Sequence, residues 1–183
     1  MRIKRILAVS LGAAMLAFGG QAYAGTLDGD NVTVNYLYPD SSTVYQNLGT
    51  GTVSAAGFTV NSFGQHNYTV FPSEITLTNV LGQDVNFLSA AFNGYELIDN
   101  TGSPAITGVT VGFSDVAGFD ASRVSFDATH VWLNMQSLIT TPGEDIELDL
   151  QFGTVTTPEP ATLLLFGTAL LGMAPLVLKR FTS

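Results

Sequence analysis

Three acidic residues form the most regular chemical pattern in the chain. Asp145, Glu147 and Asp149 occupy every second position of the segment 145–152. Alternate side chains of a β-strand lie about 7 Å apart on one face, a spacing that suits two carboxyl groups on either side of a glycosidic bond. A strand with one wet face shows the same pattern, and the other face of this segment is wholly apolar. We therefore expect a solvated strand face and assign no catalytic residue.

Few other residues could act as nucleophiles or general bases. The chain has no cysteine, and its two histidines are His66 and His130. Neither histidine belongs to a His-Glu-x-x-His metal motif, and no Gly-x-Ser-x-Gly elbow is present. We expect both histidines at the surface, His66 in the polar loop 64–67 and His130 at the start of a strand. The sequence therefore predicts a protein that is not an enzyme.

Acidic loops leave one metal open as an alternative. The segment Asp28-Gly29-Asp30-Asn31 offers several side-chain oxygens, and Glu144-Asp145 offers a second group. Hard oxygen ligands are what Ca²⁺ requires, but the spacing departs from an EF-hand loop because Val32 stands at its fifth position. The prediction is no metal and no cofactor, with Ca²⁺ as the alternative and solvated acidic loops as the simpler explanation.

One group of side chains could bind sugars. Trp132 shares a strand face with His130 and Asn134, opposite the apolar side chains at 131, 133 and 135. An exposed indole is a stacking platform for a sugar ring, and the two polar neighbours could hydrogen-bond its hydroxyl groups. A tryptophan covered by a loop or buried between layers fits the pattern equally well. The residues Tyr36, Tyr38 and Tyr95 leave the same two alternatives open.

The elements that must position these residues are β-strands. Alternation of apolar and polar residues predicts strands at 32–36, 75–78, 109–113, 123–127, 131–135 and 145–152, with less regular strands at 43–48, 52–60, 68–71 and 85–98. Turn residues separate them at roughly ten-residue intervals. The fold class predicted is all-β: an antiparallel, jelly-roll-like β-sandwich over residues 25–152, flanked by an N-terminal signal helix and a C-terminal transmembrane helix.

The distribution of charge excludes one class of partner. Fourteen of the fifteen acidic residues lie between residues 25 and 157, where the only basic residue is Arg123. A surface this acidic repels nucleic acid, because it offers no cations to replace the counterions of the phosphates. We therefore expect no nucleic-acid partner.

The N-terminus has the features of a secretory signal peptide over residues 1–24. Three basic residues precede an apolar stretch at 6–18, and Ala22-Tyr23-Ala24 supplies the small-x-small cleavage pattern. Signal peptidase is expected to cut between Ala24 and Gly25. An uncleaved anchor is the alternative.

The C-terminus has the features of a membrane-spanning tail. After a linker at 153–160, residues 161–178 are uncharged and mostly apolar, and Lys179 and Arg180 follow. A helix of this length is about 27 Å long, close to the hydrocarbon thickness of a bilayer. The basic pair predicts a cytoplasmic end, which places the preceding domain outside. The sorting tail is therefore assigned to residues 161–183.

The order of Pro158-Glu159-Pro160, apolar span and basic end resembles the PEP-CTERM sorting signal of Gram-negative bacteria. The family often has valine before the motif and several arginines at the end, whereas Thr157 and a single Lys-Arg pair stand here. The resemblance implies that an exosortase recognises the motif and cuts near it. A permanent transmembrane anchor is the alternative.

Together these features predict an exported, non-enzymatic protein of the cell envelope or an exopolysaccharide matrix. Its precursor would be anchored in the inner membrane by the C-terminal helix, with signal peptidase and an exosortase as processing enzymes. The alternative is an extracellular carbohydrate- or calcium-binding β-sandwich, with extracellular polysaccharide as the partner.

Overall fold

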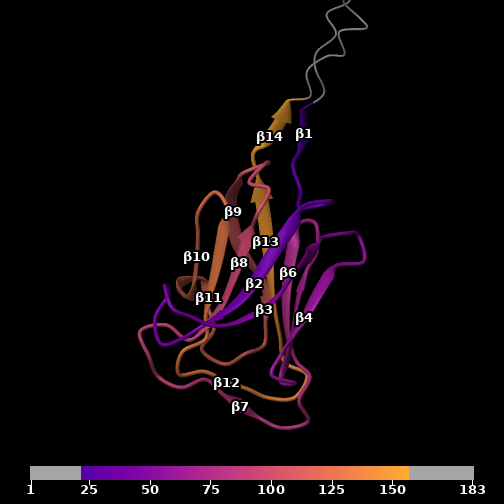
Figure 1. The fold of residues 1–183 in the computed structure, drawn as a ribbon. Helices are drawn as coiled ribbons and strands as arrows, with labels where there is room; N and C mark the ends of the chain where they lie inside the picture. The colour runs from indigo at the N-terminus through magenta and orange to yellow at the C-terminus, as the bar shows by residue number, and fades with distance from the viewer. Residues whose placement is uncertain (1–21, 157–183) are drawn as a thin grey trace, which may run out of the picture. The chain divides into compact units, whose positions relative to one another are not determined.

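Two five-stranded antiparallel sheets make up most of the computed structural model, which describes residues 22–156 (Figure 1). Residues 23–155 form one compact unit. The first sheet has the order β10 (Val124–Phe126), β11 (His130–Asn134), β8 (Gly94–Asp99), β2 (Asn31–Leu37) and β3 (Val44–Thr52). The second sheet has the order β4 (Phe58–Ser62), β5 (His66–Val70), β6 (Glu74–Asn79), β13 (Asp145–Phe152) and β9 (Ile106–Ser114).

Smaller elements complete the described part of the chain. Strand β7 (Val85–Asn86) pairs with β12 (Ile139–Thr140), and β1 (Ala22–Ala24) pairs with β14 (Thr154–Thr156). A 3₁₀ turn, η1 (Ala121–Arg123), precedes β10. The prediction of an all-β chain with antiparallel sheets is confirmed.

Strand β13 shows how the sequence pattern sets the packing. Ile146, Leu148 and Leu150 are buried, whereas the acidic side chains between them are half-buried or exposed. Leu148 pairs with Ile75 of β6 on one side and with Val111 of β9 on the other. The strand is therefore paired on both sides in its sheet, and its acidic residues form a solvated outer face, as predicted.

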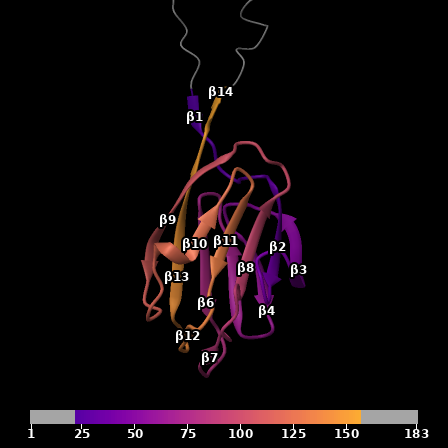
Figure 2. The same ribbon diagram turned by 90° about the vertical axis from the view of Figure 1, so that its left-hand side faces the viewer.

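The two sheets pack face to face around one apolar core. Tyr68 of β5 and Tyr95 of β8 are fully buried, and their ring centroids are 5.3 Å apart although they come from different sheets. Tyr95, whose role the sequence left open, is therefore a core residue. At the sides of the core, β3 lies beside β4 and β9 lies beside β10 (Figure 2).

Three details of the fold prediction were wrong. The expected strand 52–60 is interrupted, because the segment after β3 forms a turn in which Gly57, at φ 82°, donates its N–H to the Ser54 carbonyl. The expected strand 85–98 divides into β7 and β8, which belong to different sheets. A jelly roll joins eight strands as two Greek keys, whereas here five strands stand in each sheet and β2–β3, β4–β5, β5–β6 and β10–β11 are hairpins.

The predicted terminal segments lie largely outside the described residues. This applies to the signal helix, to the Pro158-Glu159-Pro160 motif and to the apolar tail with Lys179 and Arg180. Across residues 22–156, no helix has the length and apolar character needed to cross a membrane. The predicted cleavage point between Ala24 and Gly25 lies at the end of β1.

Candidate functional site

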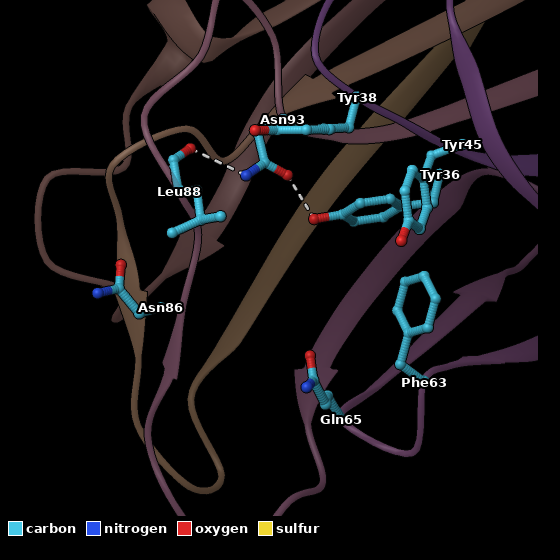
Figure 3. A pocket seen from close by; sticks show the side chains of 8 residues that line it. All are labelled: Tyr36, Tyr38, Tyr45, Phe63, Gln65, Asn86, Leu88 and Asn93. Atoms are coloured by element: carbon cyan, nitrogen blue, oxygen red, sulfur yellow. Dashed lines mark hydrogen bonds between the residues drawn. The ribbon is translucent and has the colours of Figure 1, made fainter.

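A pocket of about 350 Å³ opens where β2 ends, and aromatic rings dominate its wall (Figure 3). Its lining residues are Tyr36, Tyr38, Tyr45, Phe63, Gln65, Asn86, Leu88 and Asn93. None of them carries a charge at neutral pH, although the surrounding domain is strongly acidic.

Both sheets contribute rings to this pocket. Tyr36 and Tyr45 come from β2 and β3 of the first sheet, and Phe63 comes from the turn between β4 and β5 of the second sheet. Tyr36 stands edge to face with Phe63 at 5.3 Å and with Tyr45 at 6.3 Å between ring centroids. Tyr45 also contacts Tyr38 at 6.3 Å. We call Tyr36, Tyr38, Tyr45 and Phe63 the aromatic cluster.

Exposure of two of these rings is unusual for large aromatic side chains. Tyr45 is 64% exposed and Phe63 is 46% exposed. Phe63 also has φ 55°, in the left-handed region that a bulky residue adopts only at an energetic cost. Costly backbone conformations are concentrated at functional sites. The Phe63 ring is therefore held outward by the tight β4–β5 turn, in which Gly64 also has a positive φ.

Buried polar contacts fix the inner wall. The Tyr36 hydroxyl donates to Asn93 Oδ1, and Asn93 Nδ2 donates to the Leu88 carbonyl at 2.9 Å. Burial, with smaller contributions from Tyr38 and Tyr45, raises the pKa of Tyr36 to about 12, so its O–H remains a donor at neutral pH. These hydrogen bonds position the Tyr36 and Asn93 side chains without a ligand.

Free hydrogen-bonding groups lie at the rim. The side-chain amides of Gln65 and Asn86 make no hydrogen bond to another described residue, and each amide offers donors and an acceptor. Aromatic faces beside uncharged amides suit a ligand with both C–H faces and hydroxyl groups.

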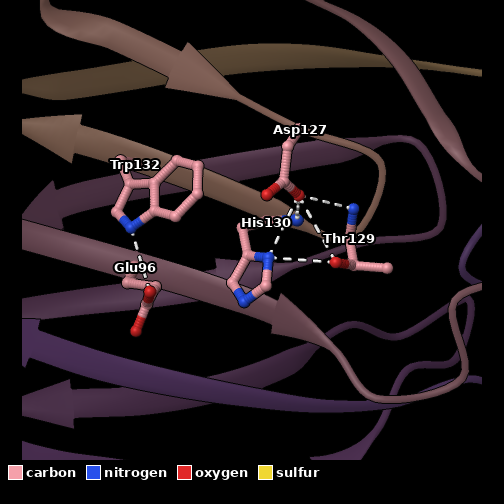
Figure 4. Close-up of polar contacts among 5 residues, drawn as sticks. All are labelled: Glu96, Asp127, Thr129, His130 and Trp132. Atoms are coloured by element: carbon pink, nitrogen blue, oxygen red, sulfur yellow. Dashed lines mark hydrogen bonds and ion pairs between the residues drawn. The ribbon is translucent and has the colours of Figure 1, made fainter. Parts of the chain in front are cut away.

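The predicted Trp132 platform is only partly open (Figure 4). Trp132 is half-buried, and its Nε1 donates to Glu96 Oε1 at 2.9 Å. Asn35 Nδ2 donates to the other oxygen of the same carboxylate, also at 2.9 Å. The His130 ring stacks on the indole with centroids 5.1 Å apart and planes 4° from parallel. One face of the tryptophan is therefore already covered.

The two partners predicted for Trp132 are also engaged in local contacts. His130 Nδ1 lies 3.0 Å from Asp127 Oδ1 and 2.9 Å from Thr129 Oγ1. Asn134 Oδ1 accepts the N–H groups of Asn93 and Gln136. The three predicted residues share one strand face, but the Oδ1 of Asn134 is occupied by two backbone N–H groups.

The prediction that His66 is a surface residue was wrong. His66 begins β5, is 1% exposed and lies 5.3 Å from the Phe87 ring. Its Nε2 is 2.8 Å from Thr140 Oγ1. Burial lowers the pKa of His66 to about 4, because the charged imidazolium is poorly solvated there. A neutral core histidine is not placed to act as a base for an external substrate.

The acidic loops do not form a conventional metal cluster. No group of three or more His, Asp or Glu residues converges within residues 22–156. Asp28 is exposed, and Glu144 Oε2 accepts the Thr141 N–H at 2.7 Å as part of a turn. Asp30 is the exception, because one of its oxygens is buried without a hydrogen-bond partner.

Comparison with known families concerns the C-terminus. Residues 156–180 match the PEP-CTERM protein-sorting motif. The chain carries a PEP-CTERM sorting motif. No curated protein and no solved structure matches the chain. The resemblance predicted from the sequence is therefore confirmed, and the evidence on what residues 22–155 do comes from their own geometry.

The PEP-CTERM motif fixes how the protein is handled. It contains Pro158, Glu159 and Pro160 and extends to the basic pair Lys179 and Arg180. Such a motif implies export as a membrane-anchored precursor and processing by an exosortase. The aromatic cluster therefore belongs to a part of the chain that is delivered outside the cytoplasm.

Sequence reasoning missed half of the aromatic cluster. For Tyr36 and Tyr38 the sequence left a sugar platform and burial open as alternatives, whereas Tyr45 and Phe63 were not singled out. The available signal was weak: Tyr45 follows Val44 in a largely polar stretch, and Phe63 directly precedes a turn glycine, Gly64.

Proposed function

We propose that this exported protein is a non-enzymatic component of the cell envelope or exopolysaccharide matrix, and that its β-sandwich binds a neutral polysaccharide through the aromatic cluster. The observation that carries the proposal is the uncharged pocket in which exposed Tyr45 and Phe63 flank free amides. Exosortase processing near Pro158-Glu159-Pro160 would release the domain into the compartment where such polymers occur.

The chemistry favours a neutral ligand over an anionic one. Aromatic rings pack against the C–H faces of a sugar, and the Gln65 and Asn86 amides can both donate to and accept from hydroxyl groups. An anionic polymer would meet repulsion from the acidic domain without any cation in the pocket to offset it. The matrix role follows from this ligand class together with the sorting motif.

A polysaccharide panel tests the proposal. The full-length protein, purified in a non-ionic detergent, would be run through native gels that contain neutral glucans, mannans or galactans, or anionic polymers such as alginate. Retardation by at least one neutral polymer, weaker with the anionic ones, is the expected result. Migration unchanged by every neutral polymer would contradict the proposal.

A further inference from the structure

Two aspartates from distant parts of the chain meet at the start of β2. Asp99 is the last residue of β8 and pairs with Val32 of β2, and Asp30 lies two residues before Val32. Since alternate residues of an extended chain share a face, Asp30 and Asp99 lie on the same side. Hydrogen bonds from Asn100 N to the Asn31 carbonyl and from Val53 N to the Asp30 carbonyl hold both backbones in place.

Each of these carboxylates has a buried oxygen with no hydrogen-bond donor among the described residues. Asp99 is 3% exposed; its Oδ1 accepts the Thr101 N–H at 2.8 Å, whereas its Oδ2 has no partner. Asp30 Oδ2 is also buried without a hydrogen-bond partner, although Asp30 as a whole is half-exposed. Burying a charged oxygen without a partner is costly, so two such oxygens indicate a missing positive charge.

Thr101 lies next to both aspartates. Its N–H donates to Asp99 Oδ1 at 2.8 Å, and its Oγ1 accepts the N–H of Asn31, the residue after Asp30, at 3.3 Å. Burial, and after it the neighbouring charge of Asp99, raise the pKa of Asp30.

No side chain of the described residues supplies the missing charge. Arg123 is the only Lys or Arg between residues 22 and 156, and its guanidinium is bound to the carbonyls of Gly118, Asn134 and Gln136. His66 and His130 contact Thr140 and Asp127 respectively. Within residues 22–156, the charge of the two carboxylates is therefore not balanced by any side chain.

We infer that Ca²⁺ binds between Asp30 and Asp99, with the Thr101 hydroxyl as a neighbouring oxygen and water in the remaining positions. Two carboxylates neutralise one divalent ion, and hard oxygen ligands in an irregular arrangement suit Ca²⁺ better than Mg²⁺, which requires near-octahedral geometry. The ion would join the β8 end to the β2 start, and so fix the loop before β2 to the loop after β8.

The site is separate from the sugar pocket. Asp30 directly precedes the first residue of β2, whereas Tyr36 lies near its last, and a strand of seven residues spans about 20 Å. The Ca²⁺ proposal can therefore be tested independently of the proposed function.

Direct binding and thermal unfolding test the site. Full-length protein in detergent would be stripped with EDTA and titrated with CaCl₂, with bound ⁴⁵Ca²⁺ measured by equilibrium dialysis. We expect one ion per chain and a saturable rise in Tm. Asp99→Asn and Asp30→Asn should each weaken binding at least tenfold, while the exposed neighbour Asp28→Asn should bind as the wild type does.

Two results would overturn the inference. The first is wild-type protein that binds no Ca²⁺ at millimolar concentrations. The second is unchanged Ca²⁺ binding by Asp30→Asn. Since Asp30 is half-exposed, this variant keeps the test decisive even where Asp99→Asn fails to fold.

Discussion

Tyr36 and Phe63 stand edge to face with ring centroids 5.3 Å apart, although Tyr36 belongs to the first sheet and Phe63 to a turn of the second. The pocket between them therefore exists only when the two sheets are packed together. Their contact links the core, in which Tyr68 and Tyr95 pack across the same two sheets, to the proposed binding surface.

The positive φ of Phe63 predicts that Phe63→Gly lowers polysaccharide binding without lowering stability. Phe63→Gly relieves a φ of 55° that glycine adopts freely, and this gain offsets the loss of a ring that is only half-covered. We expect the free energy of unfolding to change by less than about 1 kcal/mol, while polysaccharide binding falls at least tenfold. Chemical denaturation and native-gel retardation measure the two quantities. Binding that survives the substitution would remove Phe63 from the site.

Burial of His66 predicts acid sensitivity in a defined range. The folded-state pKa is lowered to about 4 from an ordinary value of 6.5, so the unfolded chain binds more protons between these values. Stability should therefore be complete above pH 6.5 and fall as the pH decreases towards 4, by about 2 kcal/mol at pH 5. Urea unfolding at pH 7.5, 6 and 5 measures this change. In His66→Gln the fall over this range should be largely absent; an equal fall would show that other groups cause it.

The Trp132–Glu96 hydrogen bond predicts a structural role for Trp132. Trp132→Phe leaves Glu96 Oε1 without its donor in a half-buried setting, which should cost about 1–3 kcal/mol of unfolding free energy. A double-mutant cycle that combines Trp132→Phe with Glu96→Gln should give a stabilising coupling energy between the two residues, because they hydrogen-bond each other. His130→Ala removes the stacked ring and its contacts with Asp127 and Thr129 but leaves the Trp132–Glu96 hydrogen bond, and so serves as the matched control. Loss of polysaccharide binding in Trp132→Phe without loss of stability would restore the platform predicted from the sequence.

The sorting motif predicts a processing defect. Glu159→Ala, made in the native host, should leave precursor that retains residues 161–183, because the exosortase would no longer recognise its site. The wild-type protein should begin at Gly25 and end near residues 158–160. Intact mass and terminal sequencing distinguish these forms, and Thr157→Val provides a control that keeps the motif. Identical termini in wild type and Glu159→Ala would mean that the motif is not cut.

Most of the fold prediction rested on the alternation of apolar and polar residues within each strand. The bounds of β13 and its solvated acidic face followed from period two alone, as did the burial of Leu133 opposite Trp132. His66 was misjudged because its neighbours in sequence are polar, although its alternation with Tyr68 and Val70 places it on the buried face. The alternation of residues along a strand identifies the buried face, whereas the polarity of the neighbouring residues does not.

Neither candidate site could be predicted from the sequence, because each joins segments that are far apart in it. Phe63 reaches Tyr36 only through the packing of two sheets, and Asp99 reaches Asp30 only through the β2–β8 register. Strand order decides both relationships. In the second sheet that order inserts β13 between β6 and β9, which no local pattern specifies.

Comparison of two surface aromatics tests the central claim most directly. Tyr45→Ala removes a 64% exposed ring from the aromatic cluster, and Phe126→Ala removes a 42% exposed ring from β10, outside the cluster. Both substitutions should leave Tm nearly unchanged, since neither ring is in the core. Affinity for the neutral polysaccharide, measured by calorimetry, should fall at least tenfold in Tyr45→Ala and stay at the wild-type value in Phe126→Ala. Equal affinities in all three proteins would contradict a sugar site at the aromatic cluster.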